Sequence, residues 1–296
     1  MRVIVLLAAA CVAAQTDPAA DLQRMIAAER AFAAATKEIG VRDGFLTFFT
    51  GDAIDVAPVG RRLELVNATD RLRAQPPPRL PLVIELAWEP RWGAISSAGD
   101  LGWLTGPSRI HSRGGSDQDR HGAYFSIWRR QPDRTYKVRL DIGIATARPV
   151  IFPDGFTPAT RPVAPAHAAP ATAAAASEIR LIEARFAESA SNDLGGAYRS
   201  HLLPDARLHR NERSPFVGVE AAAGFMTETF DRMTWAVLHD EMAASGDVAF
   251  TAGAYAAAAK ASEGRPGSHE RGFFVRVWHR IADGAWKVAF ETNGIR

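Results

Sequence analysis

The sequence predicts an α+β protein of two tandem domains, in each of which a curved antiparallel sheet wraps round N-terminal helices. A similar pair of strands ends each half, over residues 122–143 and 272–294, and an Asp-Gly turn joins the second pair. Trp128 and Trp278 occupy the same place in these hairpins and lie 150 positions apart. Both halves also show the same order of helix, helix, strand, helix and a run of strands. These observations indicate a duplicated domain.

Length and composition agree with two globular domains. The chain has 296 residues, of which 47% are hydrophobic and 23% are charged, so each half can bury a core. The net charge of +2 is close to neutral, and no basic stripe interleaves with aromatic residues. We therefore expect no nucleic-acid partner.

The N-terminal segment has the features of a secretory signal peptide. Met1 and Arg2 give a short positive start, an apolar run follows over residues 3–10, and small residues end at Ala14. The apolar run is too short for a membrane span. We expect a signal peptide over residues 1–14 and a periplasmic or secreted protein, with a buried first helix as the alternative.

Cys11 is the one cysteine of the chain, and it lies inside this segment. Its surroundings loosely resemble a bacterial lipoprotein box, although Ala8 stands where leucine is preferred. Cleavage after Ala14 is the main expectation, and lipidation of Cys11 is the alternative. Cleavage there would leave no thiol, which excludes disulfides and cysteine catalysis.

The first domain is expected over residues 15–152. An amphipathic helix over residues 21–36 is followed by a second helix, a strand and a polar helix that ends near Arg73, before Pro76. The remaining strands lead to the first hairpin. Their expected ranges are 82–88, 93–97 and 102–105.

A linker is expected over residues 153–176, where five prolines stand among alanine and threonine without an apolar period. The second domain then covers residues 177–296 and repeats the pattern of the first. Trp235 matches Trp88, and the other matches across the two halves have offsets between 147 and 154.

These residues resemble the nuclear transport factor 2-like superfamily, which has the cystatin-like cone fold of ketosteroid isomerase and SnoaL-like proteins. Within it the chain is most similar to a secreted bacterial branch of mostly uncharacterised domains. The resemblance covers nearly all of both domains. The segments that carry it are residues 29–32, 88–90, 99–102, 128–143, 183–186, 246–247 and 278–291.

The resemblance also implies a departure from ketosteroid isomerase chemistry. That enzyme has a general-base aspartate before a Pro-x-Gly turn, where this chain has Ala57 in the first half and Ser214 before a similar turn in the second. The acidic hydrogen-bond donor of the hairpin strand aligns near Ser126 and Arg276. Isomerase chemistry of that type is therefore not expected.

Alternation along the hairpins divides each into two faces. We expect the apolar face to pack on the helices; it carries Phe125, Ile127, Val138, Leu140 and Ile142, or Val275, Val277, Val288 and Phe290. Asp141 and Glu291 then fall outside the cone, in structural ion pairs. The outer face, with Trp128 and Trp278, is either solvated or covered by pairing of the two halves through their sheets or by homo-oligomers.

Glu29 and Glu183 are the first candidate site residues, because each lies on the apolar stripe of its helix, close to Phe32 or Phe186. A carboxylate there is partly desolvated and could bind a ligand, with Phe32 or Phe186 as a further ligand-binding residue, or act as an acid or base. The alternative is a buried glutamate satisfied by an arginine or a backbone amide.

In the second domain, His201, His209 and Tyr198 could join Glu183 at a pocket mouth. On this hypothesis Glu183, His201 and His209 are catalytic, and Tyr198 helps to bind the ligand; isolated surface histidines are the alternative. No nucleophile elbow, phosphate loop or dinucleotide motif appears, and no histidine spacing suits zinc. We expect neither a cofactor nor a metal.

Two functions remain open. One is a non-catalytic binding or interaction module that holds a small apolar molecule or no ligand. The other is a SnoaL-like isomerase, cyclase or hydrolase that uses a pocket carboxylate. Two or more titratable groups converging in one cone would favour the enzyme, whereas an apolar cone with a single polar group would favour binding.

Overall fold

The computed structural model of the chain describes residues 17–59, 62–79, 82–112, 119–165, 173–261 and 266–295. The predicted signal peptide over residues 1–14 and Cys11 lie outside the described residues, as do residues 166–172 of the predicted linker.

The first half contains three helices and the strands of one sheet. The long helix α1 begins after Asp17, whose side chain accepts hydrogen bonds from the backbone amides of Ala19 and Ala20. The elements are α1 (Pro18–Ile39), α2 (Val41–Phe48), β1 (Phe49–Val59), β2 (Arg62–Asn67), α3 (Ala68–Arg73), β3 (Ile84–Trp88), β4 (Trp92–Ile95), β5 (Leu101–Ser112), β6 (Arg120–Arg130) and β7 (Tyr136–Thr146).

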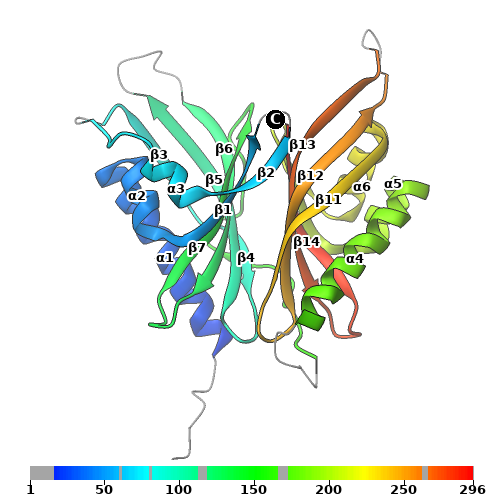
Figure 1. Ribbon diagram of the computed structural model, residues 1–296, viewed down its shortest axis with the longest axis horizontal. Helices are drawn as coiled ribbons and strands as arrows, with labels where there is room; N and C mark the ends of the chain where they lie inside the picture. Colours follow the sequence, from blue (N-terminus) through cyan, green and yellow to red (C-terminus); the bar gives the residue numbers. More distant parts are fainter. Residues whose placement is uncertain are drawn as a thin grey trace, which may run out of the picture.

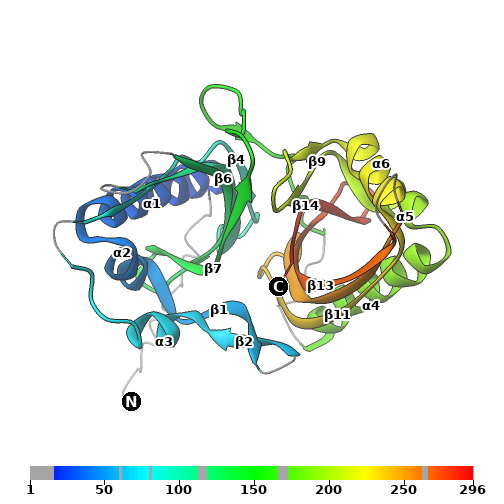
Figure 2. The same cartoon turned by 90° about the horizontal axis from the view of Figure 1, so that it is seen from above.

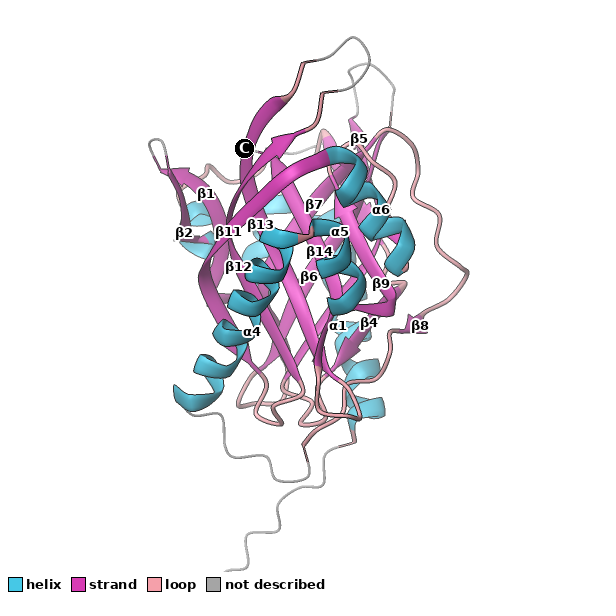
Figure 3. Cartoon of the chain, turned by 90° about the vertical axis from the view of Figure 1, so that its right-hand side faces the viewer, coloured by secondary structure: helices cyan, strands magenta, loops and turns pink. Residues whose placement is uncertain are grey.

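The connecting segment adds β8 (Thr157–Pro158), and the second half repeats the order of the first. Its three helices cover one face of its sheet (Figure 3). The elements are α4 (Ala173–Asn192), α5 (Leu194–His201), β9 (Leu202–Arg210), β10 (Phe216–Val217), α6 (Val219–Thr229), β11 (Phe230–Met242), β12 (Val248–Ala259), β13 (Ser268–Arg280) and β14 (Trp286–Ile295).

The predicted tandem α+β fold is confirmed. The first sheet has the order β2-β1-β7-β6-β5-β4-β8, with β3 paired to β5, and the second has the order β10-β9-β14-β13-β12-β11. Both sheets are mixed, because β1 runs parallel to β7 and β9 runs parallel to β14. The two sheets lie at the centre of the molecule, and the helices lie on its two outer sides (Figure 1).

The sheets face one another and share a core, so pairing of the two halves through their sheets is present within one chain. Phe125 of β6 stacks on Phe290 of β14 with ring centroids 4.2 Å apart and planes 5° apart. Trp103 of β5 lies 5.7 Å from Phe290 and donates a hydrogen bond from Nε1 to His279 Nε2, at 2.9 Å. Residues of both halves belong to a single buried cluster.

The prediction that the apolar hairpin face packs on the helices is wrong. That face, represented by Phe125 and Phe290, forms the interface between the sheets, whereas Ser126 and Trp128 face α1 and hydrogen-bond Glu29. Both faces of each sheet are buried, so alternation identifies the residues that share a face but not the layer that covers it.

A β-bulge interrupts the register between β6 and β7. Ile127 pairs with Leu140 rather than with Val138, and Trp128 pairs with Val138, so a β-bulge leaves Arg139 without a partner residue on β6. The bulge turns Val138 toward the helices, beside Trp128 in the core of the first half. Asp141 consequently stands directly opposite Ser126 on the inner face.

Part of the predicted linker packs on both halves. The backbone amide of Thr157 donates to the carbonyl of Arg91, and that of Val163 donates to the carbonyl of Arg280. Thr160 donates from its amide and its hydroxyl to Asp205, both at 2.8 Å. Residues 157–163 therefore connect the two sheets through hydrogen bonds.

Candidate functional site

Glu29 lies in the interior of the first half, fully buried, on the side of α1 that faces the sheet. Trp88 Nε1 donates to Oε1 at 2.6 Å, while Ser126 Oγ and Trp128 Nε1 donate to Oε2 at 2.6 and 2.8 Å. Burial raises the pKa of Glu29 to about 7, although the three hydrogen bonds oppose this shift. These three uncharged donors fix the carboxyl group in the interior of the first half.

Glu183 occupies the same position in the second half and has a charged partner. Thr251 Oγ1 and Trp278 Nε1 donate to Oε1 at 2.5 and 2.9 Å, and Trp235 Nε1 donates to Oε2 at 3.1 Å. Arg276 Nη1 also donates to Oε2, at 2.6 Å. The expected burial of both glutamates is confirmed, and Glu183 matches the alternative of a carboxylate satisfied by an arginine.

Arg276 joins two acids inside the second half. Its Nε donates to Glu291 Oε2 at 2.7 Å, in addition to the bond with Glu183. Glu291 Oε1 accepts from the hydroxyl of Tyr198 at 2.7 Å and from Nδ2 of Asn293 at 2.9 Å. The members of this network are buried and bond to one another, so structural contacts fill the interior of the second half.

The placement of Glu291 and Asp141 corrects a second prediction. Both were expected outside the cone, yet they share a face with Arg276 and Ser126, and that face is turned toward the interior. Glu291 does form an ion pair, with Arg276. In the first half Ser126 stands where Arg276 stands in the second, and within the described part of the chain no basic side chain pairs with Asp141.

Burial raises the pKa of Asp141 well above its usual value, and the nearby charges of Glu29 and Asp55 raise it further. Tyr124 lies on the same strand face as Ser126, and its buried hydroxyl has no hydrogen-bond partner among the described residues. The first half therefore keeps the acids of the second half without their cation.

The two halves also differ in how the sheet closes. In the second half, β9 remains paired with β14 from Phe290 to Asn293. In the first half, β1 pairs with β7 only at Phe49 and Ile54, and then turns with β2 toward β11 and β12 (Figure 2). An opening remains between β1 and β7 beside Asp141.

A pocket of about 390 Å³ occupies this opening. Asp141 and Gly143 of β7 form one wall, and an ion pair between Arg71 and Asp55 lies at the edge. A methyl group added at Gly143 would meet no atom within 4 Å. The apolar lining includes Phe45, Phe49, Ile54, Leu72 and Ile142 from the first half and Phe273 from the second.

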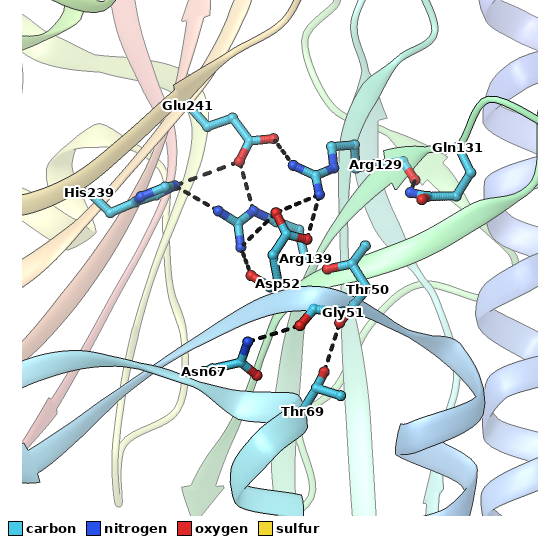
Figure 4. Close-up of polar contacts among 10 residues, drawn as sticks. All are labelled: Thr50, Gly51, Asp52, Asn67, Thr69, Arg129, Gln131, Arg139, His239 and Glu241. Carbon is cyan, nitrogen blue, oxygen red and sulfur yellow. Dashed lines mark hydrogen bonds and ion pairs between the residues drawn. The ribbon is translucent and has the colours of Figure 1, made fainter.

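The bulge residue Arg139 fixes β1 next to this opening (Figure 4). Its guanidinium donates to the carbonyl of Asp52 on β1 and, from Nε, to Glu241 Oε2 of β11 at 2.8 Å. Arg129 Nη2 binds Asp52 Oδ1 at 2.6 Å, and His239 Nε2 lies 3.6 Å from Glu241 Oε2. This cluster joins β1, β7 and the second sheet.

Side chains at the start of α3 hold β1 from its other side (Figure 4). Asn67 Nδ2 donates to the carbonyl of Gly51 at 2.9 Å, and Thr69 Oγ1 donates to that of Thr50 at 2.7 Å. The strand is thus fixed by hydrogen bonds immediately before it leaves β7. These hydrogen bonds therefore hold the opening between β1 and β7 in place.

The histidines predicted to act with Glu183 do not reach it. His201 hydrogen-bonds the Ala197 carbonyl of its own helix through Nδ1, at 2.8 Å. His209 lies against Phe290 at the interface between the sheets, and burial lowers its pKa to about 3. His201 does contact Phe186, with ring centroids 4.8 Å apart, so that ring separates it from the interior.

The other predicted binding residues are buried in the interiors. Phe32 packs on Trp88 and Phe186 on Trp235, with ring centroids 4.8 and 4.9 Å apart, and Tyr198 hydrogen-bonds Glu291. The pocket residue that the sequence reasoning missed is Asp141. The sequence signal for Asp141 is its match with Glu291 in the second half.

No family model matches the chain, and no curated protein matches it significantly. Solved structures similar to it include a nuclear transport factor 2-like superfamily protein from Salmonella enterica serovar Typhimurium, at 18% identity and a TM-score of 0.35. This match covers 42% of this chain and 92% of the other.

Two further structures of this kind have similar coverage. A protein of unknown function with a cystatin-like fold from Nostoc punctiforme is 20% identical, with a TM-score of 0.33, over 42% of this chain and 93% of its own. A ketosteroid isomerase-like protein from Erwinia carotovora atroseptica is 19% identical, with a TM-score of 0.32, over 41% and 91%. Proteins of the superfamily named from the sequence are thus among those similar to this chain, each over less than half of its length.

The described residues contain neither a membrane-spanning helix nor a cluster of metal ligands. No helix among them is long and apolar enough to cross a membrane. No group of three or more histidine, cysteine, aspartate or glutamate side chains in the described ranges could hold a metal ion.

Proposed function

We propose that the protein is an exported binding protein whose first half holds a small, largely apolar molecule in the pocket between β1 and β7. The observation that carries the proposal is Asp141, which has no basic partner among the described residues and lies in the wall of a cavity of about 390 Å³ that combines apolar and polar side chains. Cavities of this size that combine apolar side chains with a few polar groups are typical of small-molecule sites. The second half supports the pocket through the shared core and does not bind a ligand itself.

Binding is favoured over catalysis because Asp141 is the one titratable lining residue without a charged partner among the described residues, whereas Asp55 and Arg71 are paired with each other. Glu29 is the corresponding acid of the long helix, but three donors occupy its two oxygens and it has no exposed surface. His201 and His209, the two candidate bases, lie against other parts of the second half. Proton transfer would require a second group within reach of the ligand.

Export is proposed from the sequence alone, from the positive start, the apolar run and the small residues that end at Ala14. A ligand-binding protein outside the cytoplasm would meet its ligand directly from the surroundings of the cell. The pocket opens on the surface of the molecule, which is compatible with such direct capture.

The test is the binding of a neutral apolar dye, N-phenyl-1-naphthylamine, followed by its fluorescence. We expect one saturable site in the wild-type protein. Gly143→Leu fills open space in the pocket and should weaken binding about tenfold or more, the effect of about 1.4 kcal/mol. Gly51→Leu is the matched control, because Gly51 is also an open strand glycine but does not line the pocket.

Equal dye binding by the wild type and both variants would place the dye elsewhere and contradict the proposal. A failure of the wild-type protein to bind the dye at all would contradict it as well. Loss of binding in Gly51→Leu as well as in Gly143→Leu would indicate a general disturbance of β1 and β7 rather than a blocked pocket.

A further inference from the structure

The second half shows what its two interior acids bind. Arg276 donates to Glu183 and Glu291 at 2.6 and 2.7 Å, and its guanidinium lies among aromatic rings. The distances from its central carbon to the ring centroids are 4.6 Å for Phe186, 4.8 Å for Trp235, 4.8 Å for Phe274 and 5.9 Å for Trp278. Two carboxylates and aromatic faces are a cation-binding arrangement, here occupied by a side chain of the chain itself.

The first half contains the corresponding groups. Glu29 and Asp141 match Glu183 and Glu291, and the matching rings are Phe32, Trp88, Tyr124 and Trp128. The ring spacing is also retained. Phe32 lies 4.8 Å from Trp88 and 6.3 Å from Trp128, and the equivalent distances in the second half are 4.9 and 5.9 Å.

The cation itself is missing from the first half, since Ser126 replaces Arg276. Ser126 satisfies Glu29 with a hydroxyl, but Asp141, opposite it on β7, receives no cation from the described residues. The Tyr124 hydroxyl is buried nearby and lacks a hydrogen-bond partner in the part of the chain that the structure describes. The opening between β1 and β7 exposes Asp141 to a pocket, which the closed second half does not do for Glu291.

We propose that the pocket of the first half takes an organic cation, an amidinium, guanidinium or ammonium group on a small apolar body, with the charged group paired to Asp141. The positive charge of the bound ligand would take the place that the guanidinium of Arg276 has in the second half. Its apolar body would pack against Phe45, Phe49 and Leu72. This inference rests on the proposed function and names the ligand class of the same pocket.

The charge around Asp141 favours a cation over an anion. Glu29 and Asp55 are the acidic groups whose charges act on Asp141, and Arg71 at the pocket edge is paired with Asp55. A carboxylate ligand would therefore approach acids, whereas a cation would relieve their repulsion. A planar amidinium can also form two parallel hydrogen bonds with one carboxylate.

The test uses benzamidine and its neutral isostere benzamide, with binding to the full chain measured by calorimetry near neutral pH. We expect one benzamidine site per chain, because Arg276 already occupies the equivalent place in the second half. Benzamidine should bind about tenfold or more tightly than benzamide, since the two differ in charge and not in shape.

Asp141→Asn should remove this preference while Asp154→Asn, an exposed control, should keep it. Asp141 lies in the pocket wall and Asp154 does not. Thermal unfolding of each variant shows whether it is folded. If Asp141→Asn does not fold, Gly143→Leu serves as the second variant, because a blocked pocket should bind neither compound.

Binding should also release protons, because a cation lowers the pKa of a carboxyl that burial has raised. Benzamidine stays charged throughout, so its affinity should rise with pH until Asp141 is ionised in the free protein. Calorimetry in two buffers of different ionisation enthalpy measures the proton release. Benzamide binding should release no protons.

The outcomes separate this inference from the proposed function. Equal binding of benzamidine and benzamide, or a benzamidine preference that survives Asp141→Asn, overturns the cation class and leaves a binding pocket in place. Dye binding at the pocket without any benzamidine binding overturns the cation class in the same way. If the dye also fails to bind, the proposed function fails, and the inference fails with it.

Discussion

Ser126 of β6 and Arg276 of β13 occupy the same position in the two halves, and each donates a hydrogen bond of 2.6 Å to the glutamate of its own long helix. The arginine also reaches a second acid, which the serine is too short to do. The two halves therefore differ around this position. A buried ion network fills the interior of the second half, whereas the first half keeps Asp141 beside an opening, without a basic partner among the described residues.

Arg276→Ala should destabilise the protein strongly, because it leaves Glu183 and Glu291 buried without their shared cation. Removing one partner of a buried ion pair costs about 3–5 kcal/mol of unfolding free energy. Ser126→Ala is the matched control and should cost about 1 kcal/mol, the value of one hydrogen bond. Denaturant unfolding monitored by circular dichroism measures both. Equal losses for the two variants would contradict the view of Arg276 as the central charge of a structural network.

The repeat and the identity of the buried helix residues could be predicted from the sequence. Glu29 and Glu183 stand on apolar stripes whose period is local, so their burial follows from helix geometry. The hairpin face that packs on the helices could not be predicted. Both faces of each sheet are covered, and alternation does not show which layer covers each face. A clue was present in Trp88 and Trp128, whose indole N–H groups need acceptors once they are buried.

The pocket could not be predicted from local pattern either. It depends on the point at which β1 leaves β7, after Ile54, and the bulge residue Arg139 fixes that point through contacts with Asp52 and Glu241. Glu241 is about a hundred positions from Arg139 in the sequence, so only the folded arrangement reveals the pairing. The prediction for Asp141 failed because the hairpin face that it shares with Ser126 and Trp128 is the face that packs on the helices, which alternation does not reveal.

Glu29 should make the stability of the protein fall as the pH rises. Its pKa is about 7 in the folded protein, above the ordinary value of 4.5, so the folded state holds the proton more tightly than the unfolded state does. The contribution is therefore fully present below about pH 4.5 and is lost between pH 4.5 and 7, by about 3 kcal/mol at most.

Glu29→Gln removes this titration. It should cost about 1–3 kcal/mol at pH 4.5, because an amide cannot accept from all three donors, and the deficit should shrink as the pH rises to 8. Denaturant midpoints of wild type and variant across this range measure the difference. Glu183→Gln should instead be destabilised across the whole range, since it loses the ion pair with Arg276. A deficit for Glu29→Gln that does not change with pH would show that the carboxyl is ionised throughout.

The mature protein should begin near Gln15 and lie outside the cytoplasm. The reason is the order of charges, apolar residues and small residues over positions 1–14, which the export machinery recognises. Mass spectrometry of the periplasmic fraction of a bacterial expression host measures the N-terminus. A diacylated Cys11 would support the lipoprotein alternative, which Cys11→Ser would abolish. A full-length chain that retains Met1 in the cytoplasm would contradict export.

Low pH should weaken the contact that His279 makes between the two halves. This histidine is fully buried, and Trp103 Nε1 of the other sheet donates to its Nε2 at 2.9 Å. Its Nδ1 lies 2.9 Å from the Thr160 carbonyl, so the two partners assign the proton to Nδ1. Burial lowers the pKa of His279 to about 4, although the bond to Thr160 opposes the shift. The neutral ring therefore joins both sheets and the connecting segment.

The folded-state pKa lies below the ordinary value of 6.5, so the folded state binds the proton less readily than the unfolded state does. The stability contributed by His279 is fully present above about pH 6.5 and is lost as the pH falls to about 4, by about 3 kcal/mol at most. His209 adds to the loss at lower pH, because its pKa is lowered to about 3. A proton on His279 Nε2 would oppose the indole N–H of Trp103, which breaks the contact between the halves.

His279→Gln tests this directly, because the amide oxygen can still accept from Trp103 but the side chain does not titrate. We expect lower stability than wild type at pH 7, by about 1 kcal/mol for the lost bond to Thr160, and a shallower decline between pH 6.5 and 4. His269→Gln, an exposed residue of the same strand, is the control and should follow the wild type. Denaturant unfolding at half-unit steps of pH gives the slopes. Identical slopes for His279→Gln and wild type would mean that residues other than His279 make the contact between the halves sensitive to low pH.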